Sequence, residues 1–226
     1  MEHTTTSEYR DFFAAVEPIR MRDPLATLFG AFKGENDIIE YSFTDVIKAA
    51  GHACPTISMT YVACKYVVKA LFPDGIGQRG DMSVIVHGEK DDGSYGVMAQ
   101  VFSLITGACP ETGFKGMGGL HRRNNLLRYG KQMDKDHVQF TVRRNDTKAQ
   151  CMVSLNPQAL PSHAPDKARR LADLLTPNIW EIAGANERTE FKNLWMEQIQ
   201  KIVSEEKDRP LWLNIKTKEV YDAKIT

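Results

Sequence analysis

The stretch 55–72 reads PTISMTYVACKYVVKALF and is apolar on nearly every side of a helix. Pro55 suits the first turn, where the N–H that it lacks would have no partner in the helix. The sequence Pro73-Asp74-Gly75 then stops the run. Together these features predict a long buried helix, around which the rest of the chain must pack. The β-branched run 82–87 that follows it predicts a core strand.

Shorter elements are predicted before this helix. Apolar residues spaced three and four apart predict a helix within 9–32, which two prolines interrupt. The β-branched and aromatic run 38–43 predicts a short strand. Ser42 or Thr44 can cap a helix over 45–50 that leads into the long helix.

Further elements are predicted after the strand at 82–87. The apolar run 97–105 contains good helix formers and predicts a helix. The stretch 106–119 is rich in glycine and predicts a loop that could carry functional residues. Two runs, 138–143 and 150–155, predict strands joined by a hairpin turn that contains an Asn-Asp pair. The sheet is therefore expected to contain antiparallel pairing.

Three prolines between 157 and 165 mark a change of composition. The elements expected after them are helices over 166–175 and 187–205 and an extended piece over 211–220. We therefore predict an α+β fold with a mixed, partly antiparallel sheet packed by helices. It would consist of a core domain over 1–156 and a C-terminal helical extension over 157–226.

Composition limits the classes of function. The 226 residues include 29 basic and 29 acidic side chains, with 42% hydrophobic and 26% charged residues, as in globular proteins. Balanced charge gives no field that would attract nucleic acid or an anionic membrane, so neither is expected as a partner. No apolar run reaches the roughly 18 residues of a membrane span, and the first eight residues lack an export signal. We therefore expect a cytoplasmic protein.

Candidate metal ligands stand where two predicted helices meet. His52 and Cys54 lie two residues apart, directly before Pro55. A thiol at a helix N-terminus is favoured as thiolate, the form that binds zinc. Cys109 is also followed by proline, and a third ligand would complete the pattern of a catalytic zinc site with one open position. The alternative is a packed, inert pair at 52 and 54 and an unreactive Cys109 in a tight turn.

A basic group follows the glycine-rich stretch. Lys115, His121, Arg122 and Arg123 surround glycines whose backbone N–H groups can face an anion. They predict a binding site for a phosphate or carboxylate on a small molecule. A solvated basic loop is the equal alternative, because the spacing matches neither a Walker loop nor a dinucleotide fingerprint.

Other notable residues are expected to be structural. Cys64 lies on an apolar helical stripe and Cys151 alternates within a strand, so both are predicted to be core residues. His87 ends a strand and is expected to be hydrogen-bonded there. The three tryptophans, Trp180, Trp195 and Trp212, are expected to anchor the C-terminal helices.

The order of these motifs resembles the FmdE-like family of formylmethanofuran dehydrogenase proteins over about residues 40–155. The motifs are Tyr41-Ser42-Phe43-Thr44-Asp45-Val46, Gly51-His52-Ala53-Cys54-Pro55 and Ile105-Thr106-Gly107-Ala108-Cys109. The resemblance implies an α+β fold, a homodimer, and a bound metal, usually zinc, at positions matching His52, Cys54 and Cys109.

Three functions remain open from the sequence. The first is metal binding by His52, Cys54 and Cys109, in a cleft for an anionic small molecule. The second is haem binding, because the chain has two Cys-Pro dipeptides, at Cys54 and Cys109, with His52 as a partner ligand. The third is a non-catalytic accessory subunit that docks through its C-terminal helices onto a redox enzyme or a second copy.

Overall fold

The long apolar stretch forms the central helix α4 (Pro55–Leu71) of the computed structural model, which describes residues 6–31, 38–73, 75–91, 93–204 and 207–218. Eleven of its 17 residues are buried. Two of these are polar, and their hydroxyls are satisfied within the helix: Ser58 and Thr60 each donate to a carbonyl four residues back, at 2.7 Å. The prediction of a buried helix is confirmed.

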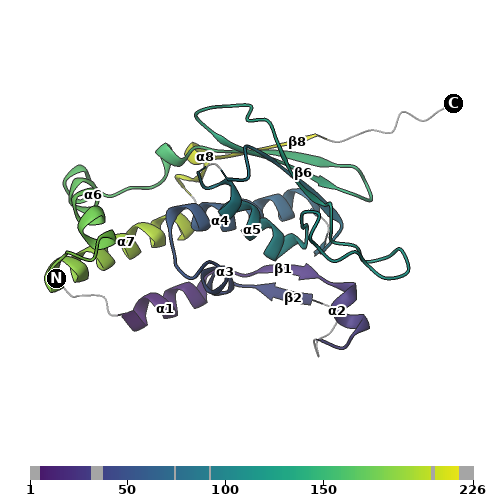
Figure 1. Ribbon diagram of the computed structural model, residues 1–226, viewed down its shortest axis with the longest axis horizontal. Helices are drawn as coiled ribbons and strands as arrows, with labels where there is room; N and C mark the ends of the chain where they lie inside the picture. Colours follow the sequence, from purple (N-terminus) through teal and green to yellow (C-terminus); the bar gives the residue numbers. More distant parts are fainter. Residues whose placement is uncertain (1–5, 32–37, 74, 92, 205–206, 219–226) are drawn as a thin grey trace.

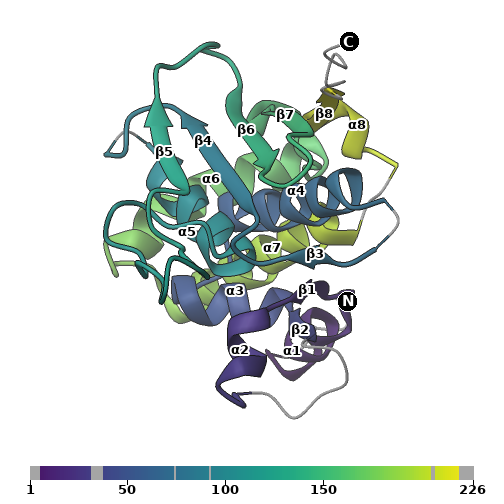
Figure 2. The ribbon, with the colours of Figure 1, turned by 90° about the vertical axis from the view of Figure 1, so that its right-hand side faces the viewer.

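A five-stranded mixed sheet covers one side of α4 and α5 (Tyr95–Thr106) (Figures 1 and 2). Its strands, in spatial order, are β5 (Leu127–Gly130), β4 (Met82–His87), β6 (Val138–Arg144), β7 (Gln150–Leu155) and β8 (Leu213–Lys218). β4 and β5 are parallel, and the other pairs are antiparallel. Alternate residues such as Phe140 and Val142 are fully buried toward the helices. The outer face carries the polar side chains between them.

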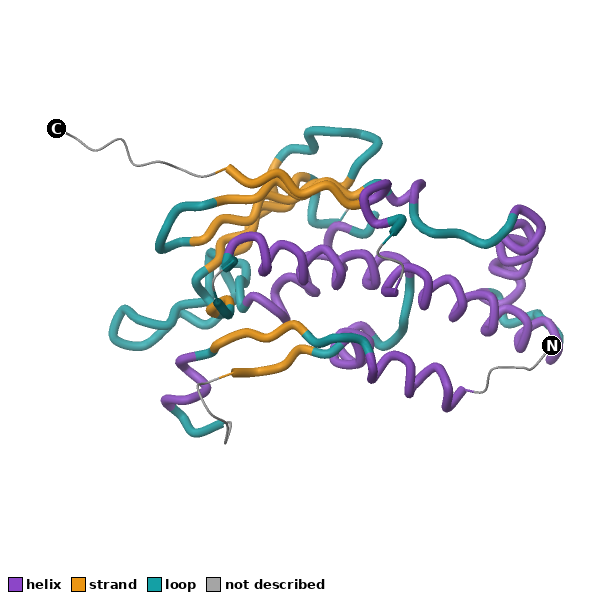
Figure 3. Tube along the Cα trace, turned by 180° about the vertical axis from the view of Figure 1, so that it is seen from behind, coloured by secondary structure: helices purple, strands orange, loops and turns teal. Residues whose placement is uncertain are grey.

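A second, three-stranded sheet lies on the opposite side of the helices (Figures 1 and 3). Its order is β2 (Ile38–Tyr41), β1 (Ile19–Arg22) and β3 (Gly77–Gln78). The helices of this layer are α1 (Thr6–Ala15), α2 (Pro24–Leu28) and α3 (Phe43–Ala50). The helix predicted within 9–32 therefore ends early. Ile19 lies in β1 because Pro18 cannot continue a helical hydrogen-bond pattern.

The C-terminal part is built into the same core. Its elements are a 3₁₀ turn η2 (Pro157–Ala159) and helices α6 (Pro165–Ile179), α7 (Ala185–Ser204) and α8 (Arg209–Trp212), followed by β8. β8 pairs with β7 along its whole length, and Ile199, Ile202 and Trp212 belong to the main hydrophobic core. The main core therefore takes side chains from both sides of the boundary predicted at residue 157. Of the extended piece expected over 211–220, residues 219 and 220 lie outside the described part.

Several local expectations can be compared directly with the structure. Ser42, and not Thr44, caps α3, and Gly51 ends it in the left-handed conformation with φ 78°. Cys64 and Cys151 are buried core residues, as predicted. Trp212 is 1% exposed, but Trp180 is 71% exposed, so the prediction that all three tryptophans anchor the helices was wrong for Trp180.

Candidate functional site

His52 presents one ring nitrogen to solvent. Gly51 ends α3 in a left-handed turn, and the exposed His52 follows with Nδ1 3.0 Å from the carbonyl oxygen of Ala50. A carbonyl only accepts hydrogen bonds, so Nδ1 must carry the hydrogen. In the neutral ring, Nε2 then keeps its lone pair. A backbone carbonyl that fixes the tautomer in this way is the usual support of a metal-binding histidine.

Cys54 stands two residues later, as the N-cap of α4. Its thiol is free and half-buried and makes no capping hydrogen bond. The residue between, Ala53, is held in place from the C-terminal part of the chain, because Trp195 Nε1 donates to its carbonyl at 2.8 Å. The turn that carries both candidate ligands is therefore fixed against α7.

A cleft of about 1080 Å³ opens beside this turn, between α1, α3 and α7. Ala53 lies in its wall, and Phe13, Ile47 and Met196 give it an apolar surface. The walls are joined by the Tyr9 hydroxyl, which donates to the Asn193 carbonyl at 3.4 Å. The charged side chains that line the cleft are Arg10, Asp11, Lys48 and Lys192. Among the described side chains that line the cleft, three are basic and one is acidic, which favours an anion, although Lys48 Nζ also lies 3.7 Å from Asp45 Oδ1.

Cys109 lies elsewhere in the fold. It lies three residues after Thr106, the last residue of α5. The Thr106 carbonyl accepts a hydrogen bond at 2.8 Å from the backbone N–H of Gly80, which comes shortly after β3 in the chain. Gly77 of β3 lies against Val68, near the end of α4. Cys54 begins that helix, 14 residues and about 21 Å earlier. The structure therefore does not bring Cys109 to His52 and Cys54.

Within the described ranges, no group of three or more His, Cys, Asp and Glu side chains is placed to hold a metal ion. Of the three predicted ligands, only His52 and Cys54 remain together. Metal binding at these two residues stays a prediction.

The basic residues of the glycine-rich loop do not face one site. Lys115 and Arg122 are exposed, and His121 is half-buried in a left-handed conformation with φ 57°. Arg123 points inward and is 7% exposed. Its guanidinium Nη2 lies 2.8 Å from an Asp23 carboxylate oxygen. Arg123 is therefore part of the fold's interior, apart from the other three.

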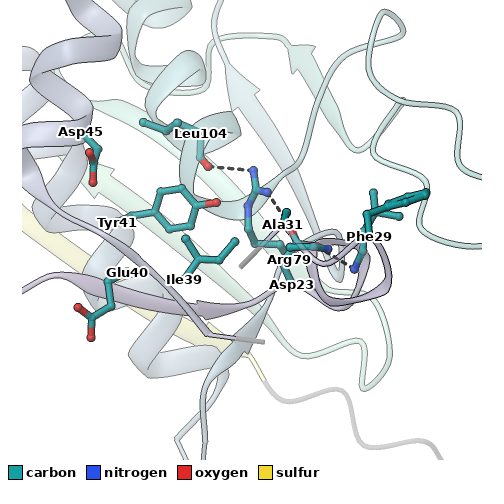
Figure 4. A pocket seen from close by; sticks show the side chains of 11 residues that line it. Asp23, Phe29, Ala31, Ile39, Glu40, Tyr41, Asp45, Arg79 and Leu104 are labelled. Carbon is teal, nitrogen blue, oxygen red and sulfur yellow. Dashed lines mark hydrogen bonds and ion pairs between the residues drawn. The ribbon is translucent and has the colours of Figure 1, made fainter. Parts of the chain in front are cut away.

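Asp23 joins three segments through a buried ion cluster that was not predicted from the sequence. Arg79 Nη1 binds its second carboxylate oxygen at 2.7 Å, opposite Arg123. The Arg79 guanidinium also donates to the carbonyls of Leu104 and Ile105 and lies over the Tyr41 ring, 5.2 Å from its centroid (Figure 4). Burial lowers the pKa of Arg123, and the neighbouring Asp23 opposes that effect.

This cluster borders a second pocket, of about 590 Å³ (Figure 4). The Tyr41 ring and the Arg79 guanidinium form its polar end, and burial raises the pKa of the Tyr41 hydroxyl. Asp23 also caps α2, accepting from Leu25 N at 3.1 Å. The Asp-Pro pair at 23 and 24 was the available sequence signal for this cap. Nothing in the sequence indicated the two arginine partners, 56 and 100 residues away.

These features define an α+β protein with a basic, apolar-walled cleft beside a His/Cys turn. No family model matches the chain, and a search of curated proteins found no match either. None of the helices in the described part combines the length and apolar character needed to span a membrane.

Proposed function

We propose that the chain binds an anionic small molecule with an apolar body in the cleft between α1, α3 and α7, and a transition metal at His52 and Cys54 beside it. The observation that carries the proposal is the composition of the cleft. Arg10, Lys48 and Lys192 border an apolar wall, and Ala53 places the His/Cys turn at its edge. Binding sites for small molecules commonly combine such a wall with a few polar groups that fix orientation.

The metal part of the proposal rests on the state of the two side chains. His52 Nε2 has its lone pair available because Nδ1 donates to Ala50, and the Cys54 thiol makes no capping hydrogen bond. Imidazole and thiolate are ligands that zinc and related ions prefer. The other positions around the ion would be filled by water or by donors of the bound molecule. The resemblance to the FmdE-like family agrees with zinc at this turn.

Haem is the second candidate for the same cleft. It combines an apolar macrocycle with two carboxylates, which matches the apolar wall and the three basic groups. The macrocycle supplies four nitrogen ligands, so the protein needs only one or two more, such as His52 and Cys54. This candidate differs from a zinc site in one direct observable, the absorption of bound haem.

Elemental analysis and an absorption spectrum of untagged protein test the metal site. About one zinc per chain, lost in His52→Ala and Cys54→Ala but kept in Cys109→Ala, supports zinc at the turn. A Soret band with haem supplied, lost in the same two variants and kept in the same control, supports haem. Metal or haem retained at full stoichiometry in both His52→Ala and Cys54→Ala contradicts the assignment, as does protein that binds neither.

The anionic probe anilinonaphthalene sulfonate tests the cleft by fluorescence titration. Reversing one basic wall charge in Lys192→Glu should weaken its binding by about fivefold or more, as expected for roughly 1 kcal/mol of lost attraction. Lys135→Glu, on an exposed loop outside the cleft, is the matched control and should bind as the wild type does. Equal binding by all three proteins would contradict an anion site here.

One feature favours the accessory-subunit alternative. The turn between α6 and α7 exposes three large apolar side chains: Ile179 at 67%, Trp180 at 71% and Ile182 at 78%. Backbone hydrogen bonds from Ile182 N and Ala183 N to the Pro177 carbonyl, at 3.0 and 3.1 Å, hold the turn in place. Exposed apolar groups gathered in this way are typical of protein contacts.

The family resemblance implies a homodimer, and we propose that this turn forms its contact. Sedimentation velocity should find a dimer for the wild type and a monomer for Trp180→Ser. Leu211→Ser, an exposed apolar residue on α8, serves as control and should remain dimeric. A monomeric wild type, or a dimer that Trp180→Ser leaves intact, would refute this contact.

A further inference from the structure

A polar groove of about 330 Å³ lies on the outer face of the five-stranded sheet, where β6, β7 and β8 run side by side. It is separate from the cleft at α1, α3 and α7, with which it shares no lining residue. We infer that this groove binds a neutral small molecule with several hydroxyl groups, of the size of a monosaccharide.

The floor of the groove is a row of three polar side chains that make no hydrogen bond within the described part of the chain. Gln139, Ser154 and Asn214 lie directly opposite one another on three adjacent strands. Residues paired in this way project from the same face of a sheet and are close neighbours. Within the described part of the chain, none of the three side chains makes a hydrogen bond, although the next residue on β6's outer face, Thr141, is bonded to His87 at 2.8 Å.

Two buried atoms at the groove also lack partners. Gln139 Oε1, an acceptor, and Trp212 Nε1, a donor, are both buried and form no hydrogen bond in the part of the chain described. Both residues line the groove, and Trp212 is 1% exposed. Buried polar groups are nearly always satisfied by protein, water or ligand, so this acceptor and this donor need a partner, which water or a molecule in the groove would supply.

The walls fix the chemistry of that partner. On one side His137 and Asp134 pair with each other at 3.0 Å, and on the other side α8 contributes Pro210 and Leu211. The floor offers amide and hydroxyl groups, which donate and accept equally. A hydroxyl group on a ligand does both as well. A neutral polyol satisfies this mixture better than an anion, for which Lys216 is the only unpaired cationic group lining the described groove.

Titration with unlabelled monosaccharides, including glucose, galactose and N-acetylglucosamine, tests the inference by ¹H–¹⁵N NMR. The Trp212 indole N–H signal, assigned with Trp212→Phe, reports on the groove. At least one sugar should shift it in a saturable way. Asn214→Ala and Ser154→Ala should each weaken that sugar's binding about fivefold, as expected for one lost hydrogen bond. Asn186→Ala, exposed at the start of α7, should leave binding unchanged.

The inference is overturned if no sugar shifts the Trp212 signal at millimolar concentration, or if both floor variants bind as tightly as the wild type. Inorganic phosphate is the second probe. A saturable shift with phosphate and none with any neutral sugar would show an anion site and would equally overturn the inference. None of these outcomes depends on the α1–α3–α7 cleft, so the two proposals fail separately.

Discussion

The four cysteines differ in burial: Cys64 and Cys151 are buried, and Cys54 and Cys109 are partly accessible. Burial raises the pKa of Cys64 well above its usual value and that of Cys151 to about 11. Cys54 and Cys109 are only half-buried. Because the thiolate is the reactive form, we expect iodoacetamide at pH 8 to label Cys54 and Cys109 in the native protein and to spare Cys64 and Cys151. Peptide mass mapping, with urea-unfolded protein as control, measures this, and native labelling of Cys64 would contradict it.

Among the described residues, the Asp23 carboxylate is the one negative group paired with Arg79 and Arg123. Its side chain is 6% exposed, and each oxygen is held within 2.8 Å of a guanidinium. Asp23→Asn would leave the buried Arg123 and the half-buried Arg79 without a counter-charge, at a cost of about 3–5 kcal/mol in the free energy of unfolding. Urea denaturation measures it, with the exposed Asp91→Asn as control. A loss below about 1 kcal/mol would mean that water screens the cluster.

His87 gives the fold a defined response to acid. Burial lowers its pKa below the ordinary value of 6.5, so the unfolded chain binds a proton at this residue before the native state does. Stability is therefore present above pH 6.5 and falls as the pH drops from 6.5 toward the lowered native pKa. His87→Gln, which keeps a partner for Thr141, should flatten this part of the stability profile measured in urea. If the stability of His87→Gln falls with pH as steeply as that of the wild type, other groups cause the fall.

The helix α3 shows how a local signal fixes a helix start. Ser42 Oγ accepts from Asp45 N at 3.1 Å, and Asp45 Oδ2 accepts from Ser42 N at 2.9 Å. We expect Ser42→Ala to lower the free energy of unfolding by about 1 kcal/mol, because an N-terminal N–H loses its partner. Urea denaturation with an unchanged m-value measures this. Ser162→Ala, exposed and outside any helix, should change stability by a few tenths at most.

Elements with local signals were the ones that the sequence predicted. α3 and α4 follow from a capping serine, a helix-starting proline and apolar periodicity, all within a few residues. β1, β3 and β5 were missed. β3 has two residues and pairs in parallel with β1, and β5 pairs in parallel with β4 across about 40 residues of chain. Such pairing depends on partner strands that lie far away in the sequence, and a local sequence pattern carries no information about them.

The same limit applies to the candidate sites. The sequence correctly placed His52 and Cys54 at the junction of two helices, because Gly51 and Pro55 mark it. It grouped Cys109 with them because Cys109 is also followed by proline and because the family resemblance implies a shared site, although the length of α4 separates the two places. The basic cleft residues Arg10, Lys48 and Lys192 come from three helices. In the sequence they are isolated charged residues, far apart and with nothing that marks them as a group. They come together only because α1, α3 and α7 pack against one another.

One hydrophobic core connects the N-terminal and C-terminal parts of the described chain. α7 packs against α4 and α1, and β8 completes the sheet beside β7. Ile199, Ile202 and Trp212 are at most 1% exposed within a cluster that also includes Phe13 and Tyr61 from the first third of the sequence. The C-terminal part therefore supplies interior surface that the first 156 residues do not replace.

Removing residues 157–226 should consequently abolish cooperative folding. The truncated chain would expose the face of α4 that α7 covers and the edge of β7, both of which are apolar or carry unpaired backbone groups. We expect loss of the cooperative thermal transition in circular dichroism and of dispersed amide signals in NMR spectra. A chain ending at Lys218, which keeps β8, is the control and should retain a cooperative transition. A cooperative transition in the 156-residue fragment would instead establish an independent N-terminal domain.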